Sequence, residues 1–167
     1  MATLSARIAL ALSGLFENVL DVGSASYPLA FNQNFNFANG SGANQAASIF
    51  TDTRTLAASA TEDLDLNGVL TDAFNATIAF TKIRALIICA DAGNTNDVVV
   101  GGAASNGAIS FFGASTDKVK VKPGGMFVLV APDANGYGIT AATADLLKVA
   151  NSSSGTGVTY TIIVVGS

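Results

Sequence analysis

Short runs of β-branched and aromatic residues, each closed by a turn signal, fill the stretch from Asp97 to Tyr137. The runs at 98–100, 109–112 and 126–130 have the length of strands, and glycine, proline or asparagine residues lie between them. This pattern predicts strands joined by tight turns rather than helices. The chain is therefore predicted to be all-β, with its strands packed as a sandwich of two sheets.

Eight candidate strands follow Thr61, and Ser48–Leu56 is a further pairing strand. Eight short strands with turn-rich joints suit a jelly-roll-like β-sandwich, a shape common among capsid and lectin domains. Strict alternation breaks between Leu70 and Phe80, where a short helix is expected around Asp72–Phe74. The eight predicted strands are Glu62–Leu66, Ile83–Ala90, Asp97–Gly101, Ile109–Phe112, Lys118–Lys122, Met126–Ala131, Asp145–Ala150 and Thr159–Val165.

The first part of the chain has a different pattern. Apolar residues from Leu4 to Val19 recur at spacings of three and four, which predicts an amphipathic helix. Aromatic residues then alternate with asparagine and alanine from Leu29 to Phe37, which predicts a strand or an extended arm. The small polar residues 39–47 are the best linker candidate. We therefore predict an N-terminal helix and Phe-rich arm over residues 1–47 and a jelly-roll-like β-sandwich over residues 48–167.

The apolar residues of this first part have two possible roles. They either cover an edge of the same core or form an arm that docks on a neighbouring subunit, and the sequence does not separate the two. On the second interpretation they are the candidate subunit or capsid contacts. These candidates are Leu4, Ile8, Leu12, Leu15, Phe16, Phe31, Phe35 and Phe37.

The charge balance limits the partners of the chain. Charged residues are 12% of the chain and the net charge is −4, which argues against nucleic-acid binding. No apolar run approaches the length of about 20 residues that crosses a bilayer, so no membrane partner is expected. Lys118, Lys120 and Lys122 fall on one face of a predicted strand, where they guard a sheet edge or contact a small anion. The weakly charged exterior suits a subunit of a permanent assembly.

Catalysis, cofactors and metals are not predicted. The chain has no histidine, and its one cysteine, Cys89, lies in an apolar run and is expected to be buried and inert. Glu62, Asp63 and Asp65 are read as a polar strand face rather than a calcium site. The loop 91–97 lacks the ligand spacing of an EF-hand and is read as a turn.

Several segments together carry a resemblance to a known class of proteins. They are TLAASATEDLDLNGVLTDAFNATIAFTKIRALIICA, DVVVGGAASN, VKVKPGGMFVLVAPDANGYGITA and DLLKVANSSSGTGVTYTIIVVG. This series resembles small structural proteins of tailed-bacteriophage virions, including jelly-roll capsid decoration (cement) proteins. The resemblance covers roughly residues 55–166 and rests on strand and turn patterns.

The resemblance implies a non-enzymatic subunit, made in the host cytoplasm and bound to the outer surface of the capsid. Its partners would be the major capsid protein and copies of itself, as a homotrimer. A tail- or fibre-associated virion subunit is an alternative. A lectin-like glycan- or receptor-binding module is another, with Tyr137, Asp133 and Asn135 as a thin sugar site.

Overall fold

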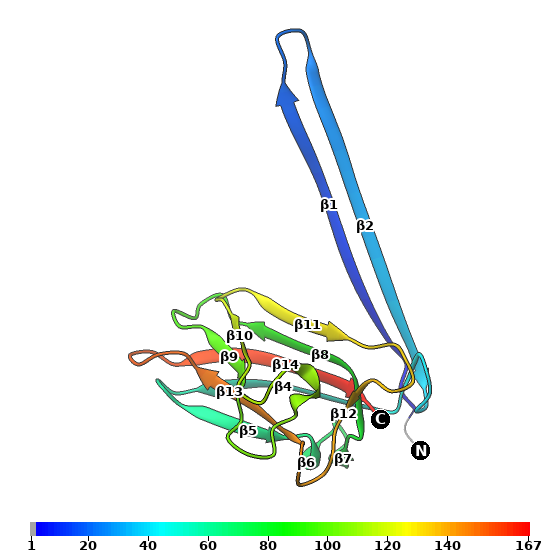
Figure 1. The fold of residues 1–167 in the computed structure, drawn as a ribbon, viewed down its shortest axis with the longest axis vertical. Coiled ribbons are helices and arrows are strands. Elements are labelled where there is room, and N and C mark those ends of the chain that lie inside the picture. The colour runs from blue at the N-terminus through cyan, green and yellow to red at the C-terminus, as the bar shows by residue number, and fades with distance from the viewer. Residues whose placement is uncertain (1–2) are drawn as a thin grey trace.

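Two packed sheets form the body of the molecule in a computed structural model that describes residues 3–167 (Figure 1). One sheet has the order β10 (Lys118–Val121), β9 (Val98–Gly101), β13 (Leu146–Asn151) and β5 (Thr61–Asp65). The other has the order β11 (Met126–Val130), β8 (Lys82–Ala90), β14 (Val158–Gly166) and β4 (Ser48–Leu56). We call the second the β8–β14 sheet; β12 (Tyr137–Gly138) extends it beside β8. All these neighbours pair antiparallel, so the predicted all-β fold is confirmed.

The core lies between the two sheets, because alternate residues of each strand face inward. In β14, Tyr160, Ile162 and Val164 are fully buried, and Leu86 and Ile88 of β8 pack against them. The sheet of β9 and β13 contributes further valines and leucines from its inner face. Seven of the eight predicted strands and the extra strand at Ser48–Leu56 overlap observed strands. Their alternation therefore located both the strands and their buried faces.

Two local predictions in the body are wrong. The expected helix around Asp72–Phe74 is the turn between β6 (Asn67–Thr71) and β7 (Thr77–Ala79). Here one carboxylate oxygen of Asp72 accepts hydrogen bonds from the backbone N–H groups of residues 74 and 76, which closes a turn instead of a helix. The expected strand Ile109–Phe112 is a short 3-10 helix, because the chain curls to pack Phe111 into the core beside Tyr137.

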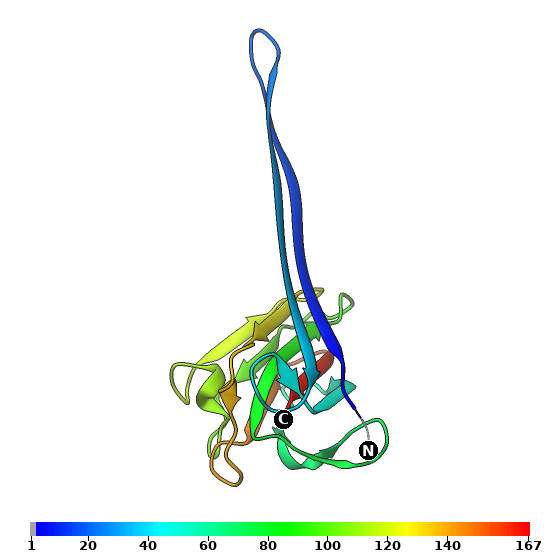
Figure 2. The same cartoon turned by 90° about the vertical axis from the view of Figure 1, so that its right-hand side faces the viewer.

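A long hairpin stands away from the body (Figures 1 and 2). Its strands are β1 (Ala6–Val19) and β2 (Ser24–Asn39), which pair antiparallel along their length, and we call this hairpin the arm. The predicted helix over Leu4–Val19 is wrong. Ile8, Leu10 and Leu12 also fit a period of two, and the alternating strand β2 places Phe35 opposite Ile8 and Phe31 opposite Leu12. The glycine at position 14 further weakens a helix there.

The base of the arm is fixed to the body. The short strand β3 (Gln45–Ala46) runs parallel to the end of β2, and the N–H of Asn44 bonds to the carbonyl of Pro132. The fully buried Arg84 donates from Nη2 to the carbonyl oxygens of Ser41, Gly42 and Ala134, at 2.7, 3.0 and 3.1 Å, and from Nη1 to that of Asp133. The segment predicted as a linker is thus a hydrogen-bonded junction that sets the position of the arm.

Candidate interaction surface

The register of the arm divides it into two chemically different faces. Residues directly opposite each other in an antiparallel pair share a face, and successive residues alternate. One face carries nearly all the large apolar side chains and no charge; we call it the apolar face of the arm. The opposite face carries Arg7, Glu17 and a mixture of asparagines, serines and alanines, with Leu15 and Val19 near its outer end. The apolar face consists of Ala6, Ile8, Leu10, Leu12, Gly14, Phe16, Tyr27, Leu29, Phe31, Gln33, Phe35 and Phe37.

The apolar face is buried at the base of the arm and exposed toward its tip. Phe37 at the base is 1% exposed, whereas Phe31 is 49%, Tyr27 is 65% and Phe16 is 76% exposed. A two-stranded ribbon has no second layer to cover it and is marginally stable alone in water. Large contiguous apolar patches of this kind mark interaction sites. The outer part of the arm is therefore the main candidate interaction surface of the chain.

The candidate contact residues are divided between two places. Leu4, Ile8, Phe35 and Phe37 lie together at the base, where they pack in one cluster that we call the base cluster. Besides them, it contains Ala6, Ala46, Ala85, Val130, Ile163 and Val165.

The remaining candidates lie farther out on the arm. Leu12, Phe16 and Phe31 belong to the exposed apolar face, whereas Leu15 pairs with Pro28 on the opposite face. Sequence reasoning missed Leu10 and Tyr27 as contact candidates. Reading the segment at a period of two instead of 3.6 would have found Leu10, which alternates with Ile8 and Leu12.

A second uncharged face lies on the body, on the side of the β8–β14 sheet that points away from the core. Its middle strands present Ile87, Cys89 and Ile163, and its β11 edge presents Met126, which is 66% exposed, and Val128. On the other edge, β4 presents a row of threonines. We call this surface the outer face of the sheet. It consists of Ile49, Thr51, Thr53, Thr55, Ala85, Ile87, Cys89, Met126, Val128, Val130, Thr159, Thr161, Ile163 and Val165.

A hollow of about 330 Å³ opens at one end of this outer face. Thr53, Cys89, Thr159 and Thr161 line it together with the loops after β8 and before β11. Cys89 was expected to be buried, but it is only half-buried, because it lies with Ala85 and Ile87 on the side of β8 that points away from the core. The prediction of burial rested on the apolar residues around Cys89. It failed because β8 is apolar on both faces, including the face that points away from the core.

A partly buried polar cluster connects the two sheets at their rim. The buried Tyr160 hydroxyl donates to Glu62 Oε1 at 2.6 Å, and Arg54 Nε donates to Glu62 Oε2 at 2.7 Å. Arg54 also pairs with Asp52. Burial, together with the Glu62 carboxylate, holds the pKa of Tyr160 above its ordinary value. A tyrosine held protonated in this way is a structural donor, and these groups fasten β4 and β14 to β5.

The other polar clusters close turns or lie in solvent. Asp63 and Asp65 alternate with the buried Leu64 and Leu66, as the strand reading predicts. In the loop after β8, Asp91 Oδ1 accepts the N–H of residue 93, which confirms the turn reading. Within residues 3–167 no group of three His, Cys, Asp or Glu side chains is placed to hold a metal ion. Over the same range, no helix is long and apolar enough to cross a bilayer.

The lysine row and the thin sugar site also have internal explanations. Lys118 and Lys120 lie on β10, which is an edge strand as one of the two interpretations expected, and Lys122 Nζ pairs with Asp97 at 2.9 Å. Tyr137 packs against Phe111 in a tilted arrangement, with 5.3 Å between ring centroids and 48° between ring planes. Asp133 Oδ1 accepts the N–H groups of residues 135 and 136, which lowers the pKa of its carboxyl. The Tyr137 ring and one oxygen of the Asp133 carboxylate therefore make contacts within the protein.

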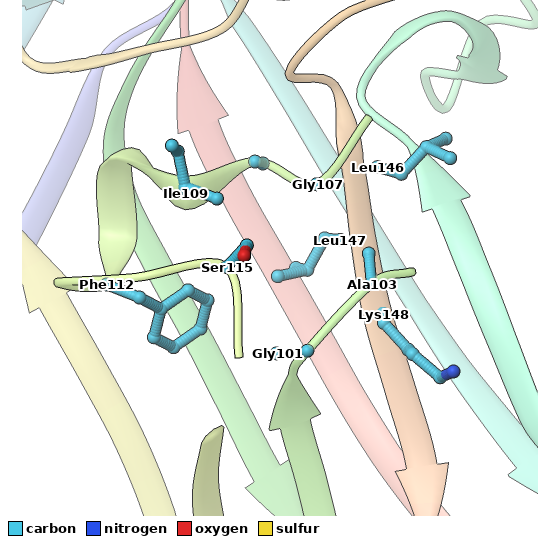
Figure 3. A pocket seen from close by; sticks show the side chains of 11 residues that line it. Gly101, Ala103, Gly107, Ile109, Phe112, Ser115, Leu146, Leu147 and Lys148 are labelled. Carbon is cyan, nitrogen blue, oxygen red and sulfur yellow. The ribbon is translucent and has the colours of Figure 1, made fainter. Parts of the chain in front are cut away.

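A small, partly open hollow lies beside the 3-10 helix (Figure 3). Ile109, Phe112, Ser115 and Leu147 surround it, and its volume is about 10 Å³. That is room for about one water molecule, so it is a packing gap and no ligand site.

The chain was compared with known proteins at three levels. No protein-family model matches it, and no curated protein sequence and no solved structure is significantly similar to it.

Proposed function

We propose that this protein is a non-enzymatic structural subunit of a virion, a capsid decoration (cement) protein that binds the outside of a phage head shell. The observation that carries the proposal is the arm with its exposed apolar face, held by a rigid base on a β-sandwich. Such an arm has no role in chemistry, but it gives a subunit an extended contact to other proteins.

The strand order supports a jelly-roll body. The body has eight main strands, which can be numbered from one to eight in chain order. In this numbering the order of strands is 1-8-3-6 in one sheet and 5-4-7-2 in the other. The eight strands are β4, β5, β8, β9, β10, β11, β13 and β14. First and last strands are neighbours in one sheet, and chain-adjacent strands mostly lie in opposite sheets, as in a double Greek-key jelly roll. Viral capsid and lectin domains use this architecture, so it favours both classes over an enzyme.

Surface chemistry favours the structural class over the lectin class. The apolar face of the arm and the outer face of the sheet are both large and uncharged, which suits desolvation in a permanent assembly. Binding to an assembled shell and not to its dissociated subunits would stabilise the shell by mass action. On this proposal the partners are the major capsid protein and copies of this chain.

Particle composition tests the proposal. Virions purified from cells that produce this chain should contain it, in hundreds of copies per particle for a shell protein, as quantitative mass spectrometry of the particles would measure. A few copies per particle would instead assign it to the tail or a fibre. If the chain is absent from particles while a glycan array shows specific binding, the lectin alternative replaces the proposal.

A further inference from the structure

The arm presents an apolar surface that its own body leaves uncovered. Between Leu10 and Phe16, and on the facing part of β2, the apolar face is half to three-quarters exposed. Three of its residues are aromatic, and an aromatic side chain buries about 150–250 Å² when covered. With the leucines between them, the exposed arm offers roughly 600 Å², close to the approximately 800 Å² per partner of a standard interface.

The base cluster shows what kind of surface this face packs against. There Ile8, Phe35 and Phe37 from the arm lie on Ala85, Val165 and other residues of the outer face of the β8–β14 sheet. The contact is apolar, with side chains of a hairpin laid on the outside of a sheet. It stops where the arm leaves the body, so it uses only one end of each surface (Figure 1).

The remainder of the outer face has the chemistry and the size to continue this contact. Ile87, Val128, Met126 and Cys89 are uncharged and at least partly exposed. The nine residues of β14 span about 30 Å, and four strands extend over about 14 Å between their outer axes. The base cluster already covers the end of this face from Ile163 onward, which leaves residues 158–162 of β14, about 17 Å, uncovered. The exposed stretch of β1 from Leu10 to Phe16 is about 23 Å long and the two strands of the arm are about 5 Å apart, so it covers the free part of the face and reaches past its end.

We propose that the apolar face of each arm docks on the outer face of the β8–β14 sheet of a second copy of this chain. This contact between two molecules is of the same kind as the contact in the base cluster within one molecule, where the apolar face of the arm packs on the outer face of the sheet. The hollow of about 330 Å³ beside Cys89 receives one of the large side chains of the arm.

A second copy is favoured over a different protein for two reasons. Each chain carries one donor arm and one acceptor face, so a reciprocal dimer or a closed ring leaves neither exposed. Apart from Asp91 at the rim of the hollow, neither surface carries a charge that would select a charged partner or oppose self-association. This inference does not rest on the role in a virion, since it concerns the purified chain alone.

Charge placed on one side of the arm tests the donor surface. Leu12→Asp puts a carboxylate on the apolar face, and Ala11→Asp puts the same group on the opposite face one residue away. In sedimentation velocity of the full-length protein, L12D should raise the dissociation constant of self-association at least tenfold, whereas A11D should change it less than twofold. Equal effects of the two variants, or a wild-type protein that is monomeric at every concentration, would overturn the proposal.

The single cysteine identifies the acceptor surface. Cysteines placed one at a time at Leu10, Leu12, Phe16 and Leu29 lie on the apolar face, and one at Ser13 lies opposite. Under mild oxidation, at least one of the first four should form a disulfide with Cys89 of another chain, located by peptide mapping. Ser13→Cys should not, and adding Cys89→Ser to the reactive variant should abolish the bond. Disulfides only between two arms, only within one chain, or none in an oligomeric sample would each refute arm-to-sheet docking.

Discussion

The arm and the body are built from the same kind of strand but bury their side chains differently. In the body, each strand packs its apolar face against a second sheet, so residues such as Ile162 and Val164 are fully buried. In the arm, an equally regular alternation leaves Phe16 and Tyr27 exposed, because no second layer covers the ribbon. An alternating pattern therefore specifies that a face should be covered, but the covering layer can belong to another molecule.

Shortening the arm tests whether the body is independent of it. Replacing residues 10–33 with Asn-Gly joins Ala9 to Asn34 by a two-residue hairpin turn and keeps the base pairs Ala6 with Phe37 and Ile8 with Phe35. We expect complete loss of self-association with an unchanged cooperative melt of the body. Calorimetry and sedimentation of the same sample measure both. A shortened protein that no longer melts cooperatively would make the arm part of the fold.

Two leucine truncations should differ strongly in their effect on stability. Leu86→Ala removes a fully buried side chain between the sheets and should lower the free energy of unfolding by about 2–5 kcal/mol. Leu12→Ala removes an exposed side chain of the arm and should change it by less than about 0.5 kcal/mol under conditions where the protein is monomeric. Urea unfolding at low protein concentration gives both values. Similar losses of unfolding free energy in the two variants would contradict the difference in burial between the body and the arm.

The junction between the regions depends on one buried cation. Arg84→Met keeps much of the side-chain volume but removes the donor to the carbonyl groups of Ser41, Gly42 and Ala134. This loss should lower the free energy of unfolding by about 1–3 kcal/mol. Hydrogen exchange of the amides of residues 40–46 should accelerate more than exchange in β8. Arg7→Met is the matched control, since Arg7 is exposed and its Nη2 donates to the side-chain oxygen of the exposed Asn34, at 2.7 Å. Equal exchange in both variants would show that Arg84 does not hold the arm.

The smallest effect expected is a pH dependence at Asp133. Backbone N–H groups of the turn hold the pKa of this carboxyl below its ordinary value of 3.8, so its folded pKa is below its unfolded one. Its contribution to stability is present above about pH 4 and is lost as the pH falls through the folded pKa. An NMR titration of the side chain should give a pKa under 3.8. Asp133→Asn should keep the turn and remove this contribution; a normal pKa at Asp133 would contradict the turn geometry.

Sequence patterns located the body well and the arm poorly, for reasons visible in single residues. In β14 and β4, alternation is strong and the observed strands coincide with the predicted ones within a residue. In the segment from Leu4 to Val19, the apolar residues fit both periods, and only the register with β2 decides between them. The sequence did not predict which residues of β8 lie on the outer face of the sheet, because β8 is apolar on both faces. For the same reason Cys89 is predicted to be buried whichever face it lies on.

The base cluster and the register of β4 also imply an order of events during synthesis. The arm pairs residues close in sequence, from Val19 with Ser24 to Ala6 with Phe37, so it can form as soon as about 40 residues have emerged. The β8–β14 sheet cannot close until the last strand is made, since β4 pairs with β14 from Leu56 with Val158 to Ser48 with Gly166. The apolar residues of the arm are therefore made before the body that anchors them, and they stay uncovered on the nascent chain until the last strand allows the β8–β14 sheet to close.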